Sequence, residues 1–238
     1  MPQVMALRWH SGHTPNGTVE SMRKILLIDV DGTLIDSYPG IRASFIHALS
    51  THGYAIPDED FLRGLPGPPM RDSIAAAGVP AEHVKTVMAD YSEHQSSGGW
   101  LDSALFPGIT ELLTTWREEG HILATATSKS YTGALRALTH FGLLEYFDYL
   151  GTAEDNGGPR QHKEDVVAYV MGLINAEHET QPSQFLMIGD RKHDAQGAKS
   201  QGIDCVLVNW GYGNEQELAQ VPLIANTTEE LKSIVEQH

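Results

Sequence analysis

The chain has 238 residues, 41% hydrophobic and 20% charged, proportions typical of a globular protein large enough to bury a substantial core. Its formal net charge of −15 argues against nucleic acid or an anionic membrane as partners, because both favour basic surfaces. A single cysteine, Cys205, excludes an intramolecular disulfide framework, and no run approaches the roughly 18 apolar residues that would predict a transmembrane helix.

The first residues contain glycine, proline and asparagine but no apolar segment of the secretory type. We therefore predict a flexible N-terminal extension at residues 1–21, with Met22 as a second candidate start. Without a secretory or membrane signal, the expected location is the cytoplasm.

The first predicted strand is the apolar run Ile25–Ile28, which is followed by Asp29 and Asp31. Side chains alternate along a strand, so the two carboxylates can serve one site only if the strand loosens, which Gly32 permits. Open α/β sheets bind ligands at the carboxyl ends of their strands. Paired carboxylates there indicate a hard cation, a nucleophile with an acid/base partner, or both. An EF-hand calcium loop is excluded because Gly40 occupies the position of its final Glu.

A small helical insertion is predicted at residues 38–100. Its first helix places Ile41, Phe45 and Leu49 on one face, and residues 96–99 are predicted to be a flexible return. Beyond it, predicted strands at residues 122–126, 185–189 and 203–208 alternate with helices, the last at residues 228–235. Parallel strands joined by helices predict a three-layer, Rossmann-like doubly wound α/β sheet.

Four segments, in order, resemble the four motifs of the haloacid dehalogenase-like (HAD) phosphohydrolase superfamily. They are Asp29–Thr33, the strand ending in Thr127, Lys163 at the start of a helix, and Gly189–Asp194. The resemblance implies that the helical insertion is a C1-type cap over an active site. The predicted division is an extension at 1–21, a core formed by 22–37 and 101–238, and a cap at 38–100.

Elementary chemistry suggests what these residues do. A phosphate monoester dianion repels an anionic nucleophile, so a phosphatase site must supply positive charge. Mg²⁺ is suited to this and prefers oxygen ligands, among them one or two carboxylates. Asp29 and Asp190 are the natural ligands, and Asp194 is expected to assist or to hold the metal's waters. Lys163 adds a fixed cation, and the Ser128 amide is expected to open a helix that cradles phosphate.

The family resemblance implies matching roles. Asp29 would be the nucleophile that becomes a phosphoaspartate, and Asp31 would protonate the leaving alcohol and later activate water. The Asp31 carbonyl would complete the Mg²⁺ ligands, and Thr127 and Lys163 would hold the phosphoryl oxygens. For Thr127, a strand-end hydroxyl bonded to backbone is a second, compatible interpretation.

Three segments look like those of phosphoglycolate phosphatase and bacterial 5′-nucleotidase-like members: Leu65–Ser73, Gly189–Asp194 and Trp210–Gly213. Within the first, Arg71 is the leading candidate for a substrate contact and Arg63 the second, since Arg suits carboxylate or phosphate. Surface solvation or a structural ion pair is the alternative for each arginine.

Together these features predict a Mg²⁺-dependent phosphatase of a small phosphorylated metabolite (phosphoglycolate, a nucleotide or a sugar phosphate), acting as a monomer or homodimer. The alternatives are a phosphomutase on the same scaffold and a non-enzymatic phospho-receiver or regulatory module. Asp31 argues against a dehalogenase, which has no leaving alcohol to protonate, and against a receiver, whose acyl phosphate must persist. A phosphonatase would need a cap lysine for a Schiff base, and Lys85 is the only one there.

Overall fold

The structure is a computed structural model that describes residues 23–155 and 158–238. The predicted extension at residues 1–21 lies outside the described residues. In the part of the chain that is described, no helix is both long enough and apolar enough to cross a membrane.

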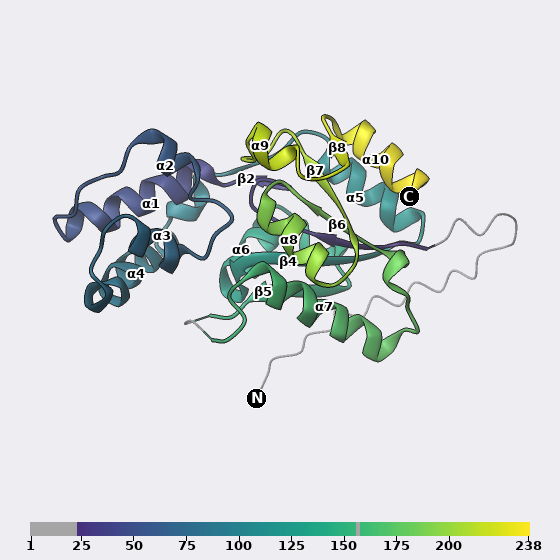
Figure 1. The fold of residues 1–238 in the computed structure, drawn as a ribbon, viewed down its shortest axis with the longest axis horizontal. Coiled ribbons are helices and arrows are strands. Elements are labelled where there is room, and N and C mark those ends of the chain that lie inside the picture. The colour runs from purple at the N-terminus through teal and green to yellow at the C-terminus, as the bar shows by residue number, and fades with distance from the viewer. Residues whose placement is uncertain (1–22, 156–157) are drawn as a thin grey trace, which may run out of the picture.

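The centre of the protein is a six-stranded sheet in the order β5-β4-β1-β6-β7-β8, with every neighbouring pair parallel (Figure 1). Its strands are β1 (Ile25–Ile28), β4 (Ile122–Ser130), β5 (Tyr149–Ala153), β6 (Phe185–Gly189), β7 (Asp204–Val208) and β8 (Leu223–Ala225). β1 lies between β4 and β6, and Ile25 is in register with Ile122 on one side and Phe185 on the other. The doubly wound sheet predicted from the sequence is therefore confirmed.

Helices cover both faces of this sheet. The helices are α5 (Ile109–Glu118), α6 (Tyr131–His140), α7 (Lys163–Glu177), α8 (Lys192–Ser200), α9 (Glu215–Leu218) and α10 (Thr228–Gln237), with 3₁₀ turns at η2 (Leu144–Tyr146) and η3 (Pro182–Gln184). Leu26 and Ile28 share one hydrophobic cluster with residues of α5, α6 and α10, whereas Ile25 and Leu27 share another with residues of α7 and α8. Burial on both faces explains why β1 is apolar at every position.

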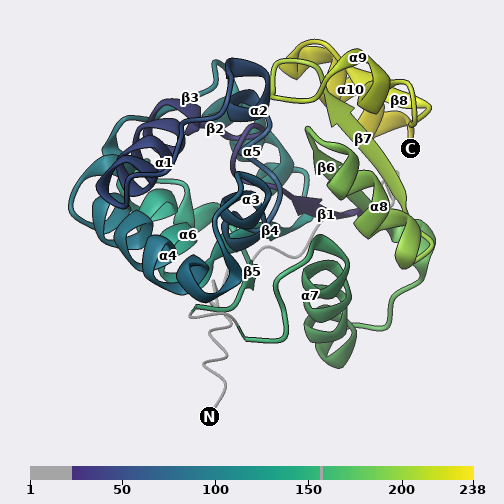
Figure 2. The same cartoon turned by 60° about the vertical axis from the view of Figure 1, so that its left-hand side comes forward.

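Four helices stand to one side of the sheet (Figures 1 and 2). They are α1 (Tyr38–Thr51), α2 (Glu59–Arg63), α3 (Met70–Ala76) and α4 (Ala81–Ser96). They have their own hydrophobic cluster, in which Phe45, Leu49 and Val87 are fully buried. The four helices therefore share a hydrophobic core of their own, and the division of the chain into a core and a cap at residues 38–100 stays a prediction.

The chain enters and leaves the helical unit side by side. Before α1 it forms β2 (Ile35–Asp36), which pairs antiparallel with β3 (Ala104–Leu105) on the return. The return itself was predicted to be flexible, but α4 continues to Ser96 and a 3₁₀ turn, η1 (Gly99–Leu101), follows. Gly99 is packed so closely that a Cβ there would lie 2.6 Å from Ser44 Oγ, and the Arg136 guanidinium lies 5.2 Å from the Trp100 ring. Packing therefore orders this segment.

Candidate active site

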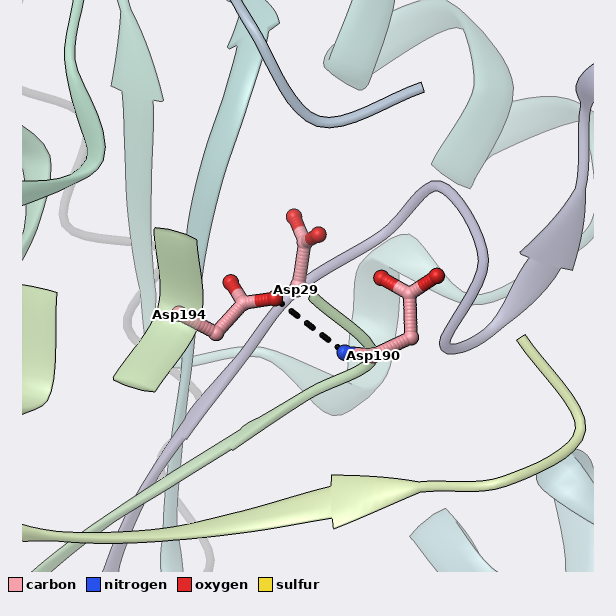
Figure 3. Close-up of side chains that lie close together, drawn as sticks. All are labelled: Asp29, Asp190 and Asp194. Carbon is pink, nitrogen blue, oxygen red and sulfur yellow. Dashed lines mark hydrogen bonds between the residues drawn. The ribbon is translucent and has the colours of Figure 1, made fainter. Parts of the chain in front are cut away.

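Three buried carboxylates converge at the carboxyl ends of β1 and β6 (Figure 3). Asp29 directly follows β1, Asp190 directly follows β6, and Asp194 lies in the first turn of α8. One oxygen from each lies within 4.8 Å of the others, and the residues are 4%, 0% and 1% exposed. Carboxylates packed this closely repel one another, so the site needs positive charge.

Lys163, the first residue of α7, supplies one positive charge. Its Nζ lies 2.9 Å from Asp29 Oδ1 and 2.8 Å from Asp194 Oδ1, and it donates to the carbonyl oxygen of Ala126 at 2.8 Å. Burial opposes the charge on Lys163, but the carboxylates of Asp194 and Asp29 outweigh it and raise the lysine pKa. The lysine is therefore held as an ammonium in the cluster.

One lysine does not balance three carboxylates. Burial raises the pKa of Asp29 to about 6, opposed by Lys163 and reinforced by the charge of Asp194. Burial, followed by the charges of Asp194 and Asp29, also raises the pKa of Asp190 well above its usual range. The cluster therefore carries a deficit of positive charge that a cation would relieve.

Backbone amides and Lys163 occupy part of the three carboxylates. Asp190 Oδ2 accepts from the Tyr212 amide at 2.7 Å, and Asp194 Oδ2 accepts from the amides of Asp190 and Arg191 at 3.1 and 3.0 Å. Asp29 Oδ1 and Asp194 Oδ1 are the oxygens that Lys163 contacts, and within the described residues Asp190 Oδ1 is buried with neither a hydrogen-bond partner nor an ion-pair partner. Three buried carboxylates this close together, one of them with an unpartnered oxygen, are a donor set that suits a hard cation such as Mg²⁺.

The turn after Asp29 is shaped by Gly32, whose φ of +85° is in the left-handed region that favours glycine. A Cβ at this position would lie 2.2 Å from Asp190 Oδ2. The turn therefore needs glycine for two reasons, its backbone conformation and its contact with the carboxylate. As predicted, the strand ends before both aspartates: β1 covers Ile25–Ile28.

Asp31 is separate from the three-carboxylate cluster. Lys129 Nζ lies 2.9 Å from both of its carboxylate oxygens, and Ser37 Oγ donates to Asp31 Oδ1 at 2.6 Å. The side chains of Asp31 and Lys129 are only 15% and 17% exposed. The sequence placed Lys129 beside the second motif, but nothing in the local pattern predicted its pairing with a residue 98 positions earlier.

Thr127 and Ser128 lie near the end of β4, directly after Ala126, whose carbonyl oxygen accepts from Lys163. Thr127 is 1% exposed and its Oγ1 accepts from the Lys129 amide at 3.2 Å. The prediction that the Ser128 amide opens a helix is wrong: β4 continues to Ser130, which pairs with β5, and Ser130 is the N-cap of α6. The Ser128 Oγ is buried without a hydrogen-bond partner in the described part of the chain.

The two cap arginines singled out from the sequence are not brought to the carboxylates. Arg63 points to solvent, 73% exposed, with Asp60 at 3.7 Å, and Arg71 is exposed. Within residues 23–155 and 158–238, neither forms a hydrogen bond or ion pair with the cluster. Next to the cluster, Arg191 of the core contacts the cap: it donates from Nη1 to the Pro66 carbonyl oxygen at 2.5 Å and from Nε to Glu217 at 2.7 Å.

Tyr212 connects the cluster to the start of the cap. Its amide donates to Asp190, and its hydroxyl donates to Asp36 Oδ1 at 2.9 Å and accepts from the amides of Ser37 and Tyr38 at 2.8 and 3.0 Å. Sequence reasoning missed this role, although the Trp210–Gly213 segment was noted for its resemblance to family members.

A parallel α/β sheet with buried carboxylates and a lysine at its central strand ends defines the class of hydrolases that the motifs predicted. The chain belongs to the haloacid dehalogenase-like hydrolases, whose family model matches residues 26–208. It is therefore an enzyme of that family.

Individual relatives differ in name. Tyrosine-protein kinase PtkA of Mycobacterium tuberculosis is 39% identical over 190 residues, 80% of this chain and 63% of PtkA, so the chain matches less than two thirds of that protein. A 5′-nucleotidase of Pseudomonas aeruginosa is 34% identical over 196 residues, covering 81% of this chain and 86% of the relative. The crystal structure of a predicted phosphatase from Clostridium acetobutylicum superimposes with a TM-score of 0.84 at 29% identity, covering 91% and 99% of the two chains.

Replacing Gly32 with alanine tests the close packing of the turn against Asp190. We expect Gly32→Ala to weaken Mg²⁺ binding by about tenfold or more and to lower the free energy of unfolding by about 2 kcal/mol or more, because the new Cβ displaces the Asp190 carboxylate. Calorimetric Mg²⁺ titration and urea unfolding measure the two effects.

Gly53→Ala is the matched control. Gly53 also has a positive φ, +71°, but a Cβ there would meet nothing within 4 Å. The free energy of unfolding of Gly53→Ala should fall only by the cost of backbone strain, about 1 kcal/mol, and its Mg²⁺ affinity should be unchanged. Equal effects of the two substitutions would show that the contact with Asp190 is unimportant.

Proposed function

We propose that the protein is a Mg²⁺-dependent phosphatase that hydrolyses small phosphomonoesters through a phosphoaspartate on Asp29. The observation that carries the proposal is the buried cluster of Asp29, Asp190, Asp194 and Lys163, with Asp31 two residues from the nucleophile. The names of the 5′-nucleotidase and phosphatase relatives support a phosphoryl-ester substrate.

In the proposed reaction, an Asp29 oxygen attacks phosphorus while the bond to the leaving alcohol oxygen breaks. Protonated Asp31 gives its proton to that oxygen, which leaves as the alcohol. Lys163, together with Thr127, holds the phosphoryl oxygens at the end of β4. When bound by Asp29, Asp190 and Asp194, with the Asp31 carbonyl, Mg²⁺ would offset the negative charge shared by the nucleophile and the phosphoryl group.

The second half of the reaction regenerates the enzyme. Water attacks the phosphorus of phosphoaspartate, the carboxylate of Asp31 takes the water proton, and the bond between phosphorus and Asp29 breaks to release inorganic phosphate. Asp31 thus ends the cycle protonated, ready for the next leaving alcohol.

Phosphate release across a panel of phosphomonoesters, with Mg²⁺ and with EDTA, tests the function. Release should require Mg²⁺, and Asp29→Asn should lower it by a factor on the order of 10³ or more while circular dichroism stays unchanged. Asp204→Asn, a change of the same chemistry at a side chain that is 71% exposed, is the control and should retain activity. Wild-type turnover by Asp29→Asn would contradict the nucleophile assignment.

The acid/base role of Asp31 predicts a dependence on the leaving group. Asp31→Asn should slow hydrolysis of alkyl phosphates by about 10²–10⁴-fold but affect formation of the phosphoenzyme from p-nitrophenyl phosphate far less, since nitrophenolate leaves without a proton. Phosphoenzyme should accumulate in this variant, as measured by acid quench of the labelled protein. Unchanged turnover of alkyl phosphates would remove Asp31 from the mechanism.

The similarity to PtkA makes protein-tyrosine phosphorylation a second candidate. The same phosphoaspartate would then form from ATP and pass its phosphoryl group to a tyrosine hydroxyl in place of water, with Asp31 taking the phenolic proton. Incubation with γ-labelled ATP distinguishes the two: label on tyrosine supports the kinase, and label in inorganic phosphate supports the phosphatase. Phosphate release from no ester at all, with Mg²⁺ bound, would favour the phosphomutase or the regulatory module.

A further inference from the structure

Asp31 is held by a lysine that the proposed reaction does not otherwise use. Lys129 Nζ is within 2.9 Å of both carboxylate oxygens of Asp31, and Ser37 Oγ occupies a further site on one of them. These three contacts use most of the roughly four lone-pair positions of the carboxylate, so Lys129 competes with the leaving-group oxygen for Asp31. Withdrawal of the lysine from one oxygen would free Asp31 for the acid step.

The other cations near the site are already committed. Lys163 is bonded between Asp29, Asp194 and the Ala126 carbonyl, and Arg191 is bonded to Glu217 and to the cap at Pro66. In the described residues, by contrast, Asp31 is the one ion-pair partner of Lys129. When Asp31 turns to the substrate, Lys129 is the cation left without an anion.

The backbone places Lys129 where it can meet the substrate. Its amide donates to Thr127 Oγ1, so the segment that would hold the phosphoryl group also fixes the base of the lysine side chain. That side chain ends at Asp31, on the leaving-group side of the reaction. One short segment thus reaches both parts of a phosphomonoester.

A partly buried ammonium that loses its carboxylate incurs a cost that another anion in the same place relieves. A neutral leaving alcohol offers none, whereas one carrying a carboxylate or a second phosphate does. We infer that Lys129 is a specificity-determining residue that binds an anionic group on the leaving-group part of the substrate, and that this contact releases Asp31 to act as the acid. The inference rests on the proposed phosphatase function and narrows its substrates to phosphomonoesters of anionic alcohols.

Three esters with a two-carbon leaving group test the inference: 2-phosphoglycolate, ethylene glycol bisphosphate and 2-hydroxyethyl phosphate. They present a carboxylate, a phosphate and a neutral hydroxyl at the same end. The wild-type protein should prefer the better of the two anionic esters to the neutral one by about 30-fold or more in kcat/KM, as expected for a hydrogen bond between charged groups. Which anionic ester is faster identifies carboxylate or phosphate as the anion.

Lys129→Met should change the two kinds of substrate in opposite directions. kcat/KM for the anionic esters should fall, and that for 2-hydroxyethyl phosphate should rise, because the ammonium no longer competes for Asp31. The preference should shrink to about threefold or less, and Lys129→Arg should retain most of it. Lys199→Met, which removes the same charge from an exposed position on α8, is the control and should keep the wild-type preference.

A parallel fall for all three esters in Lys129→Met would show a merely structural role and overturn the inference, as would a wild-type protein without preference. Binding separates this from failure of the proposed function. The Asp29→Asn variant should bind 2-phosphoglycolate more tightly than 2-hydroxyethyl phosphate, and adding Lys129→Met should abolish the difference, as measured by calorimetry. If the wild-type protein hydrolyses none of the esters but this binding difference is present, the proposed phosphatase function is rejected and the anion site is not. If Asp29→Asn binds the two esters equally, the anion site is rejected.

Discussion

The ion pairs of Lys163 are the interaction on which the site depends. Three carboxylates within 4.8 Å would not remain together in a buried position, and the lysine between Asp29 and Asp194 makes the cluster tolerable. It does not make it neutral, as the Asp29 pKa of about 6 indicates. A fully compensated cluster would have little affinity for a further cation, whereas this one keeps an unpartnered Asp190 oxygen and a deficit of positive charge for it.

The fold positions these charges with little freedom. Because β1 lies between β4 and β6, Asp29, Ala126 and Asp190 lie together at the carboxyl ends of the strands. The register of the three strands fixes their positions along the strand direction. Beyond the strand ends, a Cβ on Gly211 would lie 2.4 Å from Asp190 Cβ, so backbone packs directly on the carboxylate. The neighbouring Tyr212 then links Asp190 to the first residues of the cap. The carboxylate cluster and the residues that lead into the cap are thereby joined in one hydrogen-bonded network.

Structural features that depend on a short stretch of sequence were predictable. A fully apolar strand ending in paired aspartates indicates both a central parallel strand and a site at its end, and the sheet and the Asp29–Asp190–Asp194 cluster match that prediction. Contacts between distant segments were not predictable. The Lys129–Asp31 and Arg191–Pro66 contacts join residues 98 and 125 positions apart, and no periodicity encodes such a pairing. The helix start expected at Ser128 failed for a related reason, because pairing with β5 extends β4 to Ser130.

The charge distribution is in keeping with the inference that an anionic substrate is selected in the core. With a net charge of −15, the protein does not attract anions over long distances, and ionic screening over about 8–10 Å leaves only nearby charges effective. The exposed Arg63 is largely hydrated and already faces Asp60, so it adds little selectivity. The Lys129 ammonium is partly buried and bound to Asp31, the acid of the proposed reaction. In the inferred mechanism, recognition at that position affects the chemical step itself, since a substrate that binds the lysine would also free Asp31.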